Sequence, residues 1–535
     1  MPRRSFWGWG NEEDALAPAE RDAVGQMLAA RLGGEAPAPI APPKIDEVTL
    51  GAPRFALPAS LAHLGHVDAR TRAGHAYGKA FRDVARGLAR DFAAAPDVVA
   101  FPADEDDVRR LLDFCAEARV AAIPYGGGSS VVGGVEARLP ASRGFAGALS
   151  IDLAKLAGVR EVDVASRAAR VGGGTLGPAL EDALRPHGLT LRHFPQSFEF
   201  STLGGWIATR AGGHFATLAT HIDDSVEAVR VVTPTGLCAT RRLPASGAGP
   251  SPERLFIGSE GALGVVTEAW VRLHERPRFR ASATLRYVSF SAACRAARAL
   301  AQSGLYPTNC RVLDAAEAQN AMQGDGSANL LLVAFESSDH ALEPWIARAL
   351  EIAKGEGAEL EQGSYKVKDG GAGAREGAAG AWRQMFLRGP YLRDALVTLG
   401  YVVETFETAI TWDRFDSFSA AVRERAERVA REVTGGEVVV ACRVTHVYPD
   451  GAAPYFTVIG KGKGAASMAK QWDEIKAAVS EVIVAEGGTI SHHHATGRDH
   501  MPGYEKERAE PFARALAAVK RELDPAGVMN PGVLV

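Results

Sequence analysis

Hydrophobic and polar positions follow two different patterns before and after about residue 277. In the first part, short apolar runs alternate with glycine clusters, which predicts strands at 97–102, 148–153, 169–171 and 226–232, the last in a hairpin with 237–240. A helix is predicted at 104–120, because Val108, Leu111, Leu112 and Cys115 share one face and its first turn is acidic. A second helix is predicted at 175–187.

Beyond residue 277 the pattern changes to longer strands and helices. Strands are predicted at 283–290, 330–335, 438–447 and 454–459, and helices at 291–303, 341–354, 415–433, 466–486 and 506–523. This alternation favours an α+β domain built on an antiparallel sheet. The intervening segment 363–380, rich in Gly, Ala and Lys, is typical of a mobile lid or of a disordered loop.

Three glycine-rich segments stand out in the first part: Ile123–Glu136, Phe194–Gly213 and Ile257–Glu268. Glycine weakens regular elements, so such clusters are favoured where backbone passes close to a partner. Successive unhindered N–H groups can form a concave site for an anion such as a pyrophosphate. No GxGxxG motif opens a helix here, so we do not expect a Rossmann-type dinucleotide site.

The composition and the net charge limit the classes of function that we expect for the protein. The 535 residues are 46% hydrophobic and 23% charged, which suits two or three packed domains. With a net charge of −4, no basic surface for nucleic acid is expected. The five cysteines are scattered and never form a CxxC pair, which favours a reducing compartment over disulfides or zinc. No signal-like or membrane-spanning apolar stretch is present, so we expect a cytoplasmic protein.

The three glycine segments together resemble the FAD-binding domain of the vanillyl-alcohol oxidase family. They read PxGGGxSxxGG from Pro124, EFSTxGGWxxTRAxG from Glu199 and GSEGxLGVxTE from Gly258. The resemblance implies an α+β fold, with a PCMH-type FAD-binding domain of two subdomains and an α+β substrate (cap) domain with an antiparallel sheet. We accordingly expect an N-terminal arm and helical segment at 1–91, the FAD domain at 92–276, the cap at 277–500 and a segment returning to the FAD domain at 501–535.

A second resemblance, from Trp7 to Leu534, is to the ether-lipid branch of this family, the alkyldihydroxyacetonephosphate synthases. Its motifs are Phe6–Gly10, a turn at Tyr391–Asp394, Glu404–Thr408, Cys442–Thr445 and Ser491–His494. It implies an enzyme that exchanges the acyl chain of acyl-dihydroxyacetone phosphate for a fatty alcohol.

The resemblance assigns roles to individual residues. FAD would be bound non-covalently, because the first segment lacks the histidine that tethers flavin in some relatives. Its expected contacts are Pro124, Tyr125, Gly126, Gly127, Gly128, Ser129, Ser130, Pro195, Gln196, Ser197, Phe198, Glu199, Phe200, Ser201, Thr202, Gly204, Thr209, Arg210, Ala211, Gly212, Glu260, Gly261, Gly264, Val265 and Val266. The resemblance implies that Tyr455 is the acid/base residue, that His492, His493 and His494 line the site, and that Arg393 with Thr405 holds the substrate phosphate while Arg311 supports activity.

The chemistry of these side chains agrees with such roles, but each also has an ordinary structural explanation. A guanidinium matches a phosphate bidentately, although Arg393 could instead pair with Asp394 at the surface. A phenol such as Tyr455 needs cationic neighbours to act as a base. In an extended segment 489–495, His492 and His494 would share one face and His493 the other. No third ligand is evident, so we expect no metal there; a solvated edge strand or hydrogen bonds to substrate or flavin are the alternatives.

Two departures from the branch leave the substrate open: Gly212-Gly213-His214 replaces a Ser-Gly pair, and Ala495–His500 adds a histidine. One alternative is an FAD-linked oxidoreductase of a 2-hydroxy acid or similar alcohol. Another is a catalytically silent flavin-binding protein. The partners expected are a small-molecule or lipid substrate, a second copy in a homodimer and, through a lipid substrate, peripheral contact with the inner face of a membrane, although no amphipathic anchor is apparent.

Overall fold

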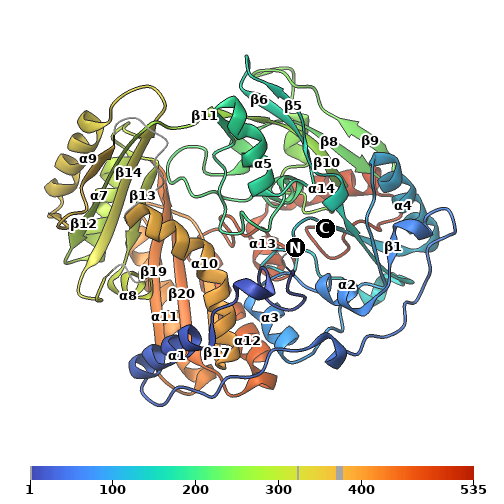
Figure 1. Cartoon of the computed structure of the whole chain (residues 1–535), viewed down its shortest axis with the longest axis horizontal. Coiled ribbons are helices and arrows are strands. Elements are labelled where there is room, and N and C mark those ends of the chain that lie inside the picture. Colours follow the sequence, from blue (N-terminus) through green and yellow to red (C-terminus); the bar gives the residue numbers. More distant parts are fainter. Residues whose placement is uncertain (1–2, 322–323, 369–377) are drawn as a thin grey trace.

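The computed structural model describes residues 3–321, 324–368 and 378–535, which form three larger sheets covered by helices (Figure 1). The α+β fold class is confirmed. Half of the expected loop 363–380, residues 369–377, lies outside the described residues; its described part contains the short strand β16 (Lys366–Lys368), and helix α10 (Ala378–Thr398) begins at its end.

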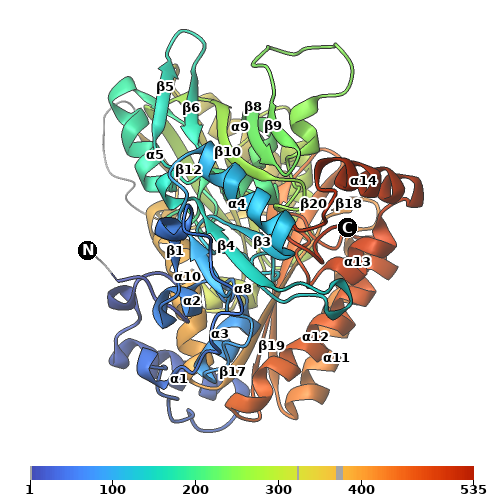
Figure 2. The same ribbon diagram turned by 90° about the vertical axis from the view of Figure 1, so that its right-hand side faces the viewer.

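In the first sheet, a buried strand leads directly into three glycines, Gly126, Gly127 and Gly128, which form the GGG loop. Its order is β1-β2-β4-β3, with β2, β4 and β3 parallel and β1 antiparallel at the edge. The strands are β1 (Gly65–His66), β2 (Val98–Ala100), β3 (Val120–Tyr125) and β4 (Gly147–Asp152). Helix α4 (Glu105–Ala118) packs the predicted apolar face on this sheet (Figure 2). The glycine cluster follows β3 directly, so the chain leaves the core there.

The second sheet is antiparallel, in the order β5-β6-β10-β8-β9. Its strands are β5 (Val159–Asp163), β6 (Ala168–Gly172), β8 (Val226–Thr233), β9 (Gly236–Ala239) and β10 (Val265–Arg272). Helices α5 (Gly177–Leu184) and α6 (Leu203–Thr209) share its core, and β7 (Leu189–Thr190) pairs with β11 (His274–Glu275). Strands β8 and β9 pair antiparallel, which confirms the predicted hairpin at 226–240.

The third sheet has nine strands and forms the other half of the molecule. Its main path is β15-β12-β14-β13-β19-β20-β17, with β16 and β18 paired at the side. The strands are β12 (Phe279–Tyr287), β13 (Asn309–Leu313), β14 (Asn329–Ser337), β15 (Glu359–Leu360), β17 (Tyr401–Glu407), β18 (Ile410–Thr411), β19 (Val438–Val447) and β20 (Gly451–Lys461). Nearly every residue of β20 is buried, because the strand is covered on both faces.

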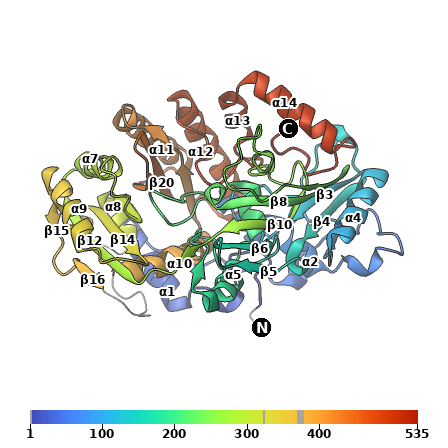
Figure 3. The same cartoon turned by 90° about the horizontal axis from the view of Figure 1, so that it is seen from above.

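Helices cover the outer face of the third sheet, and its other face meets the two smaller sheets (Figure 3). The outer helices are α7 (Phe290–Ala301), α9 (Glu343–Gly355), α11 (Phe415–Thr434) and α12 (Ala465–Ala485). Helices α1 (Pro18–Leu32) and α3 (Phe81–Leu88) join the same core through Leu28 and Val84, while α2 (Ala69–Gly74) and α8 (Ala315–Asn320) are short. No helix in the described part of the chain is long and apolar enough to cross a membrane.

Two predicted elements differ from the structure. The helix predicted at 506–523 is confirmed as α14 (Glu510–Leu523) but begins later, with Pro511 in its first turn, where proline's missing N–H costs nothing; residues 506 and 507 are instead the end of α13 (Met501–Glu507). The segment Tyr391–Asp394 is not a turn but lies inside α10. Beyond α14, the chain returns to the first sheet, where the Ala122 N–H donates to the Val528 carbonyl at 2.8 Å.

Candidate active site

A cavity of about 390 Å³ lies where the third sheet meets the two smaller ones. It is lined by the GGG loop after β3, by the loop before α6, by α10 and by the inward face of β17, β19 and β20. Segments more than 300 residues apart therefore form one wall. Most of the predicted functional residues come from these segments.

The GGG loop has the properties of an anion cradle. Among the described residues, none accepts a hydrogen bond from the backbone N–H groups of Gly127, Gly128 or Ser129, and all three residues line the cavity. A side chain at Gly127 would place its Cβ 1.8 Å from the Phe200 carbonyl oxygen, so only glycine allows this close approach. Free amides beside a cavity fit the diphosphate of FAD.

The predicted cofactor residues divide into two groups. Those that line the cavity are Gly126, Gly127, Gly128, Ser129, Ser130, Pro195, Gln196, Ser197, Ser201, Thr202, Thr209, Ala211 and Gly212. Those that the structure does not bring to its wall are Pro124, Tyr125, Phe198, Glu199, Phe200, Gly204, Arg210, Glu260, Gly261, Gly264, Val265 and Val266.

Several residues of the second group have clear structural roles. The Arg210 guanidinium lies 2.8 Å from the Asp223 carboxylate and is 61% exposed, so it turns toward solvent. The buried Glu260 carboxylate accepts hydrogen bonds from the backbone N–H groups of Thr496 and Gly497, and burial raises its pKa to about 7. Phe198 packs in the core of the second sheet.

Tyr455 projects from β20 into the cavity wall and is buried. The Arg443 guanidinium lies 3.9 Å from the centre of its ring. Burial raises the pKa of Tyr455, while Arg443 and a hydrogen bond with the Thr405 side chain oppose that rise. The phenol is therefore protonated at neutral pH and is suited to donate a proton or to share one with a neighbouring base.

The histidine triplet is not extended, so the alternation of faces considered for an extended segment 489–495 does not apply. Its backbone bends around the Glu407 carboxylate, which accepts hydrogen bonds from the backbone N–H groups of His492, His493 and His494 at 2.6, 2.9 and 3.0 Å. The Ser491 hydroxyl donates to the same carboxylate. The rings of His493 and His494 line the cavity beside Tyr455, whereas that of His492 does not reach its wall.

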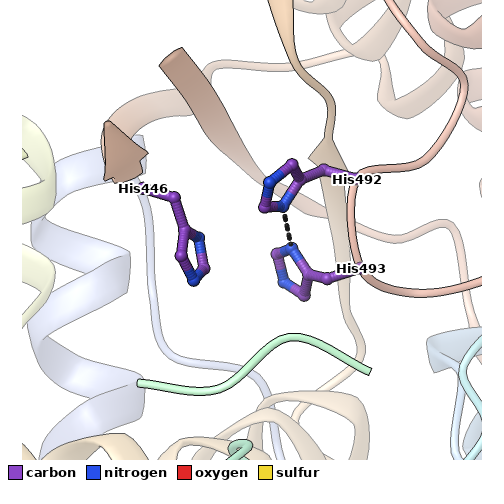
Figure 4. Close-up of side chains that lie close together, drawn as sticks. All are labelled: His446, His492 and His493. Carbon is purple, nitrogen blue, oxygen red and sulfur yellow. Dashed lines mark hydrogen bonds between the residues drawn. The ribbon is translucent and has the colours of Figure 1, made fainter. Parts of the chain in front are cut away.

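A fourth imidazole, that of His446 on β19, lies beside His492 and His493, and the sequence did not predict it (Figure 4). Ligand nitrogens of the three rings lie within 4.8 Å of one another, a spacing that could hold a metal ion. Protein groups already engage these rings, however: His446 Nε2 lies 3.0 Å from the Gly213 carbonyl oxygen and His492 Nε2 2.7 Å from the Tyr448 hydroxyl. Burial also lowers the pKa of all three imidazoles well below the usual value. A network of neutral, hydrogen-bonded rings fits this geometry better than a metal centre.

Two of the cationic side chains that line the cavity, Arg311 and Arg393, were assigned roles by the sequence resemblance. Arg311 on β13 is 2% exposed, and burial lowers its pKa to about 9, so it stays charged at neutral pH. Arg393 on α10 lines the cavity, and its Nη2 lies 2.8 Å from the Asp394 carboxylate. The expected ion pair thus exists, but it lies in the cavity wall rather than at the open surface. Its partner Asp394 also accepts a hydrogen bond from the backbone N–H of Trp9, which lines the cavity as well.

The sequence did not predict several other charged residues in the wall. Lys476 pairs with Glu404 at 2.8 Å and Arg443 with Glu317 at 2.6 Å. Each pair joins two distant elements, so no local spacing could have revealed it. The added histidine His500 does not line the cavity; its Nδ1 lies 2.9 Å from the Ala495 carbonyl oxygen.

Comparison with known protein families gives two matches along the chain. Residues 96–240 match the family described as "FAD binding domain", and residues 276–534 match "FAD linked oxidases, C-terminal domain". The first match contains the GGG loop and the loop before α6, and the second contains Arg311, Arg393, Tyr455 and the histidines.

Several known proteins are similar to this chain over most of its length. The alkyldihydroxyacetonephosphate synthase of Trypanosoma brucei brucei is 29% identical over 88% of this chain and 78% of its own length. The glycolate oxidase subunit GlcD of Bacillus subtilis is 25% identical over 82% of this chain and 89% of its own. A solved alkyldihydroxyacetonephosphate synthase superposes with a TM-score of 0.80 at 23% identity, covering 98% of both chains. For p-cresol methylhydroxylase the TM-score is 0.66 at 15% identity, covering 89% of this chain and 95% of that one.

Proposed function

Because the chain belongs to the FAD-linked oxidases, as an FAD-dependent enzyme carrying both their FAD-binding and C-terminal domains, we propose that it exchanges the acyl chain of acyl-dihydroxyacetone phosphate for a fatty alcohol. The names of its relatives support this choice, since three alkyldihydroxyacetonephosphate synthases are 28–29% identical to it over 88% of its length.

The observation that carries the proposal is one continuous cavity with three chemical parts. The amide cradle at 127–129 would hold the FAD diphosphate, and Thr202 and Thr209 would stand beside it. When bound, FAD supplies an electron-accepting ring to this cavity. The same wall carries Arg393 and Tyr455. Cofactor, anion-binding group and acid/base group can therefore meet in one volume.

The cationic side chains would hold the substrate phosphate. A guanidinium offers a planar fork of donors that matches two phosphate oxygens. Asp394 and the Lys79 carbonyl oxygen both accept hydrogen bonds from Arg393, which fixes the fork before the substrate arrives. Arg311 adds a second buried positive charge to the wall. An anionic headgroup is therefore attracted to the cavity.

Tyr455 and His493 would move the proton at the reacting carbon. Their rings lie nearly parallel with centres 6.0 Å apart, so both reach the same part of the cavity. Neutral imidazole can accept a proton, and the protonated phenol can return one. Apolar residues in the wall, Phe81, Leu392, Leu396, Val403 and Ile459, exclude water and suit an alkyl chain.

The test is a comparison of substrates on the purified flavoprotein without oxygen. With acyl-dihydroxyacetone phosphate and hexadecanol, the proposal predicts an ether-linked phosphate detected by mass spectrometry, with the oxidised flavin spectrum retained at the end. The similarity to glycolate oxidase and D-lactate dehydrogenase supports a second candidate, oxidation of a 2-hydroxy acid. Bleaching of the flavin by glycolate or D-lactate, with no ether product, would favour that candidate.

We also propose that the enzyme acts in the cytoplasm as a homodimer. Because its proposed substrate is a lipid, we propose further that it makes peripheral contact with a membrane. Sedimentation velocity would give the oligomeric state. Co-sedimentation with anionic phospholipid vesicles would test membrane contact, and a protein that stays in the supernatant would contradict it.

A further inference from the structure

A continuous series of hydrogen bonds leads from the cavity wall toward the surface. His493 lines the cavity, and its Nδ1 lies 3.0 Å from His492 Nδ1 (Figure 4). His492 Nε2 lies 2.7 Å from the Tyr448 hydroxyl. Tyr448 is half-buried at the end of β19, and the next two residues, Pro449 and Asp450, are exposed. Three side chains thus span the distance from the cavity to the exposed end of the β19–β20 hairpin.

The surrounding rings are fixed, whereas this series can reverse. A carbonyl oxygen only accepts hydrogen bonds, so His446 Nε2, beside the Gly213 carbonyl, and His221 Nε2, beside the His492 carbonyl, must carry protons. The Nε2 atoms of His446 and His221 are thereby each fixed as hydrogen-bond donors. Between His492, His493 and Tyr448, by contrast, every contact joins two groups that can each donate or accept.

We propose that His493, His492 and Tyr448 form a proton relay between the reaction cavity and solvent. The inference rests on the proposed function, because only a reaction that removes and returns a proton at a substrate carbon needs such a path. It adds Tyr448 and His492 as relay residues that need not touch the substrate.

The relay balances without leaving a charge inside the protein. In one orientation His493 Nδ1–H donates to His492 Nδ1, His492 Nε2–H donates to the Tyr448 oxygen, and the Tyr448 hydroxyl donates to Thr220 Oγ1 at 3.3 Å. His493 Nε2 is then the basic nitrogen. When it takes a proton from the substrate, the protons of His493 and His492 each shift by one hydrogen bond, and the hydroxyl of the partly exposed Tyr448 turns from Thr220 Oγ1 to give its proton to solvent. The reverse shift returns a proton to the cavity.

Neighbouring groups hold the series in register. Glu407 fixes the backbone of both histidines, and its Oε2, 3.3 Å from His493 Nδ1, favours a proton on that nitrogen, which makes the orientation described above the resting one. Thr220 lies between the Tyr448 hydroxyl and His221 Nδ1, which is 3.1 Å away. Arg443 and Arg311 line the same cavity as His493 and disfavour a lasting imidazolium, so transfer through neutral rings is the favoured route.

The experiment measures exchange of the substrate's reacting C–H hydrogen with deuterated water, by mass spectrometry of acyl-dihydroxyacetone phosphate incubated with the flavoprotein. In Tyr448→Phe, which removes one hydroxyl, exchange is expected to slow by about tenfold or more. A small imidazole buffer should then restore much of the rate by supplying protons directly. His492→Gln, which can hydrogen-bond but cannot pass a proton on, should behave in the same way.

The control is Tyr287→Phe, because the Tyr287 hydroxyl is buried in the same sheet and donates only to the Ala353 carbonyl oxygen. With this variant, the reacting hydrogen of the substrate should exchange at the wild-type rate. Wild-type exchange in both relay variants, or a loss that imidazole does not restore while FAD content is normal, would overturn the relay alone. A wild-type protein that forms no ether product and exchanges no hydrogen would overturn the proposed function and the relay with it.

Discussion

At the scale of single residues, the buried environment of the Tyr455 phenol bears most directly on the proposed acid/base chemistry. Burial keeps its phenol protonated, while Arg443 lies over its ring. We predict that Tyr455→Phe lowers kcat by roughly 10²- to 10⁴-fold, the usual contribution of a positioned acid or base, and leaves FAD content unchanged. Steady-state kinetics and the visible spectrum measure both. Tyr401→Phe, on neighbouring β17 but outside the cavity wall, is the control.

Substitution of Arg393 tests whether this side chain binds the substrate phosphate. Lysine keeps the charge but loses the planar fork, so Arg393→Lys should raise KM for acyl-dihydroxyacetone phosphate roughly tenfold or more and change kcat less. Arg388 lies on the same helix, more than half exposed, 3.6 Å from Glu20, so Arg388→Lys should leave KM as it was. Equal KM values in the two variants would contradict the role given to Arg393.

At the scale of elements, the N-terminus of α3 contains a buried acid. Asp83 accepts a hydrogen bond from the Ala80 N–H at 3.0 Å, and burial, opposed by Arg82, raises its pKa from 3.8 to about 7. An acid whose pKa is raised by folding binds more protons in the folded state. Its contribution to stability is therefore present at low pH and is lost as pH rises from about 4 to 7.

Asp83→Asn removes this titration and keeps an oxygen acceptor. The variant should match the wild type near pH 4 and become more stable above pH 7, by up to roughly 4 kcal/mol. Urea unfolding of both holoproteins at several pH values measures the difference. A difference in unfolding free energy that is constant across pH would show that Asp83 does not titrate as described.

Elements with strong periodicity could be predicted from the sequence. The helix at 104–120 and the strands at 438–447 and 454–459 were confirmed within a few residues, because their apolar positions repeat at helical or strand spacing. The histidine triplet could not be predicted, since its bend depends on Glu407, 85 residues before His492 in the chain. The break between α13 and α14 was missed although Pro511 marks it.

At the scale of the whole molecule, the cavity exists because two halves of the chain close on each other. Motif resemblance named Gly127, Arg393 and Tyr455 separately, but only the fold brings His446, Glu407 and Lys476 beside them. These residues lie in ordinary-looking strands and helices and act through partners that are distant in sequence. Local pattern carries no information about such contacts.

Gly127 is the residue of the cradle that lies directly against the segment before α6. A Cβ there would lie 1.8 Å from the Phe200 carbonyl oxygen, so Gly127→Ala must displace the loop and should lower the FAD content of the purified protein severalfold. Gly51→Ala is a matched control, because no atom lies within 4 Å of its added Cβ. The flavin absorbance per mole of protein measures both, and full FAD content in Gly127→Ala would contradict the cradle.

The central claim is that the flavin and the phosphate-binding arginine face one cavity. Titrating the oxidised protein with dihydroxyacetone phosphate and recording flavin difference spectra tests it directly. We predict a saturable spectral change in the wild type that needs much more ligand in Arg393→Lys. A colourless protein, or a flavin spectrum that dihydroxyacetone phosphate does not perturb at any concentration, would contradict the account.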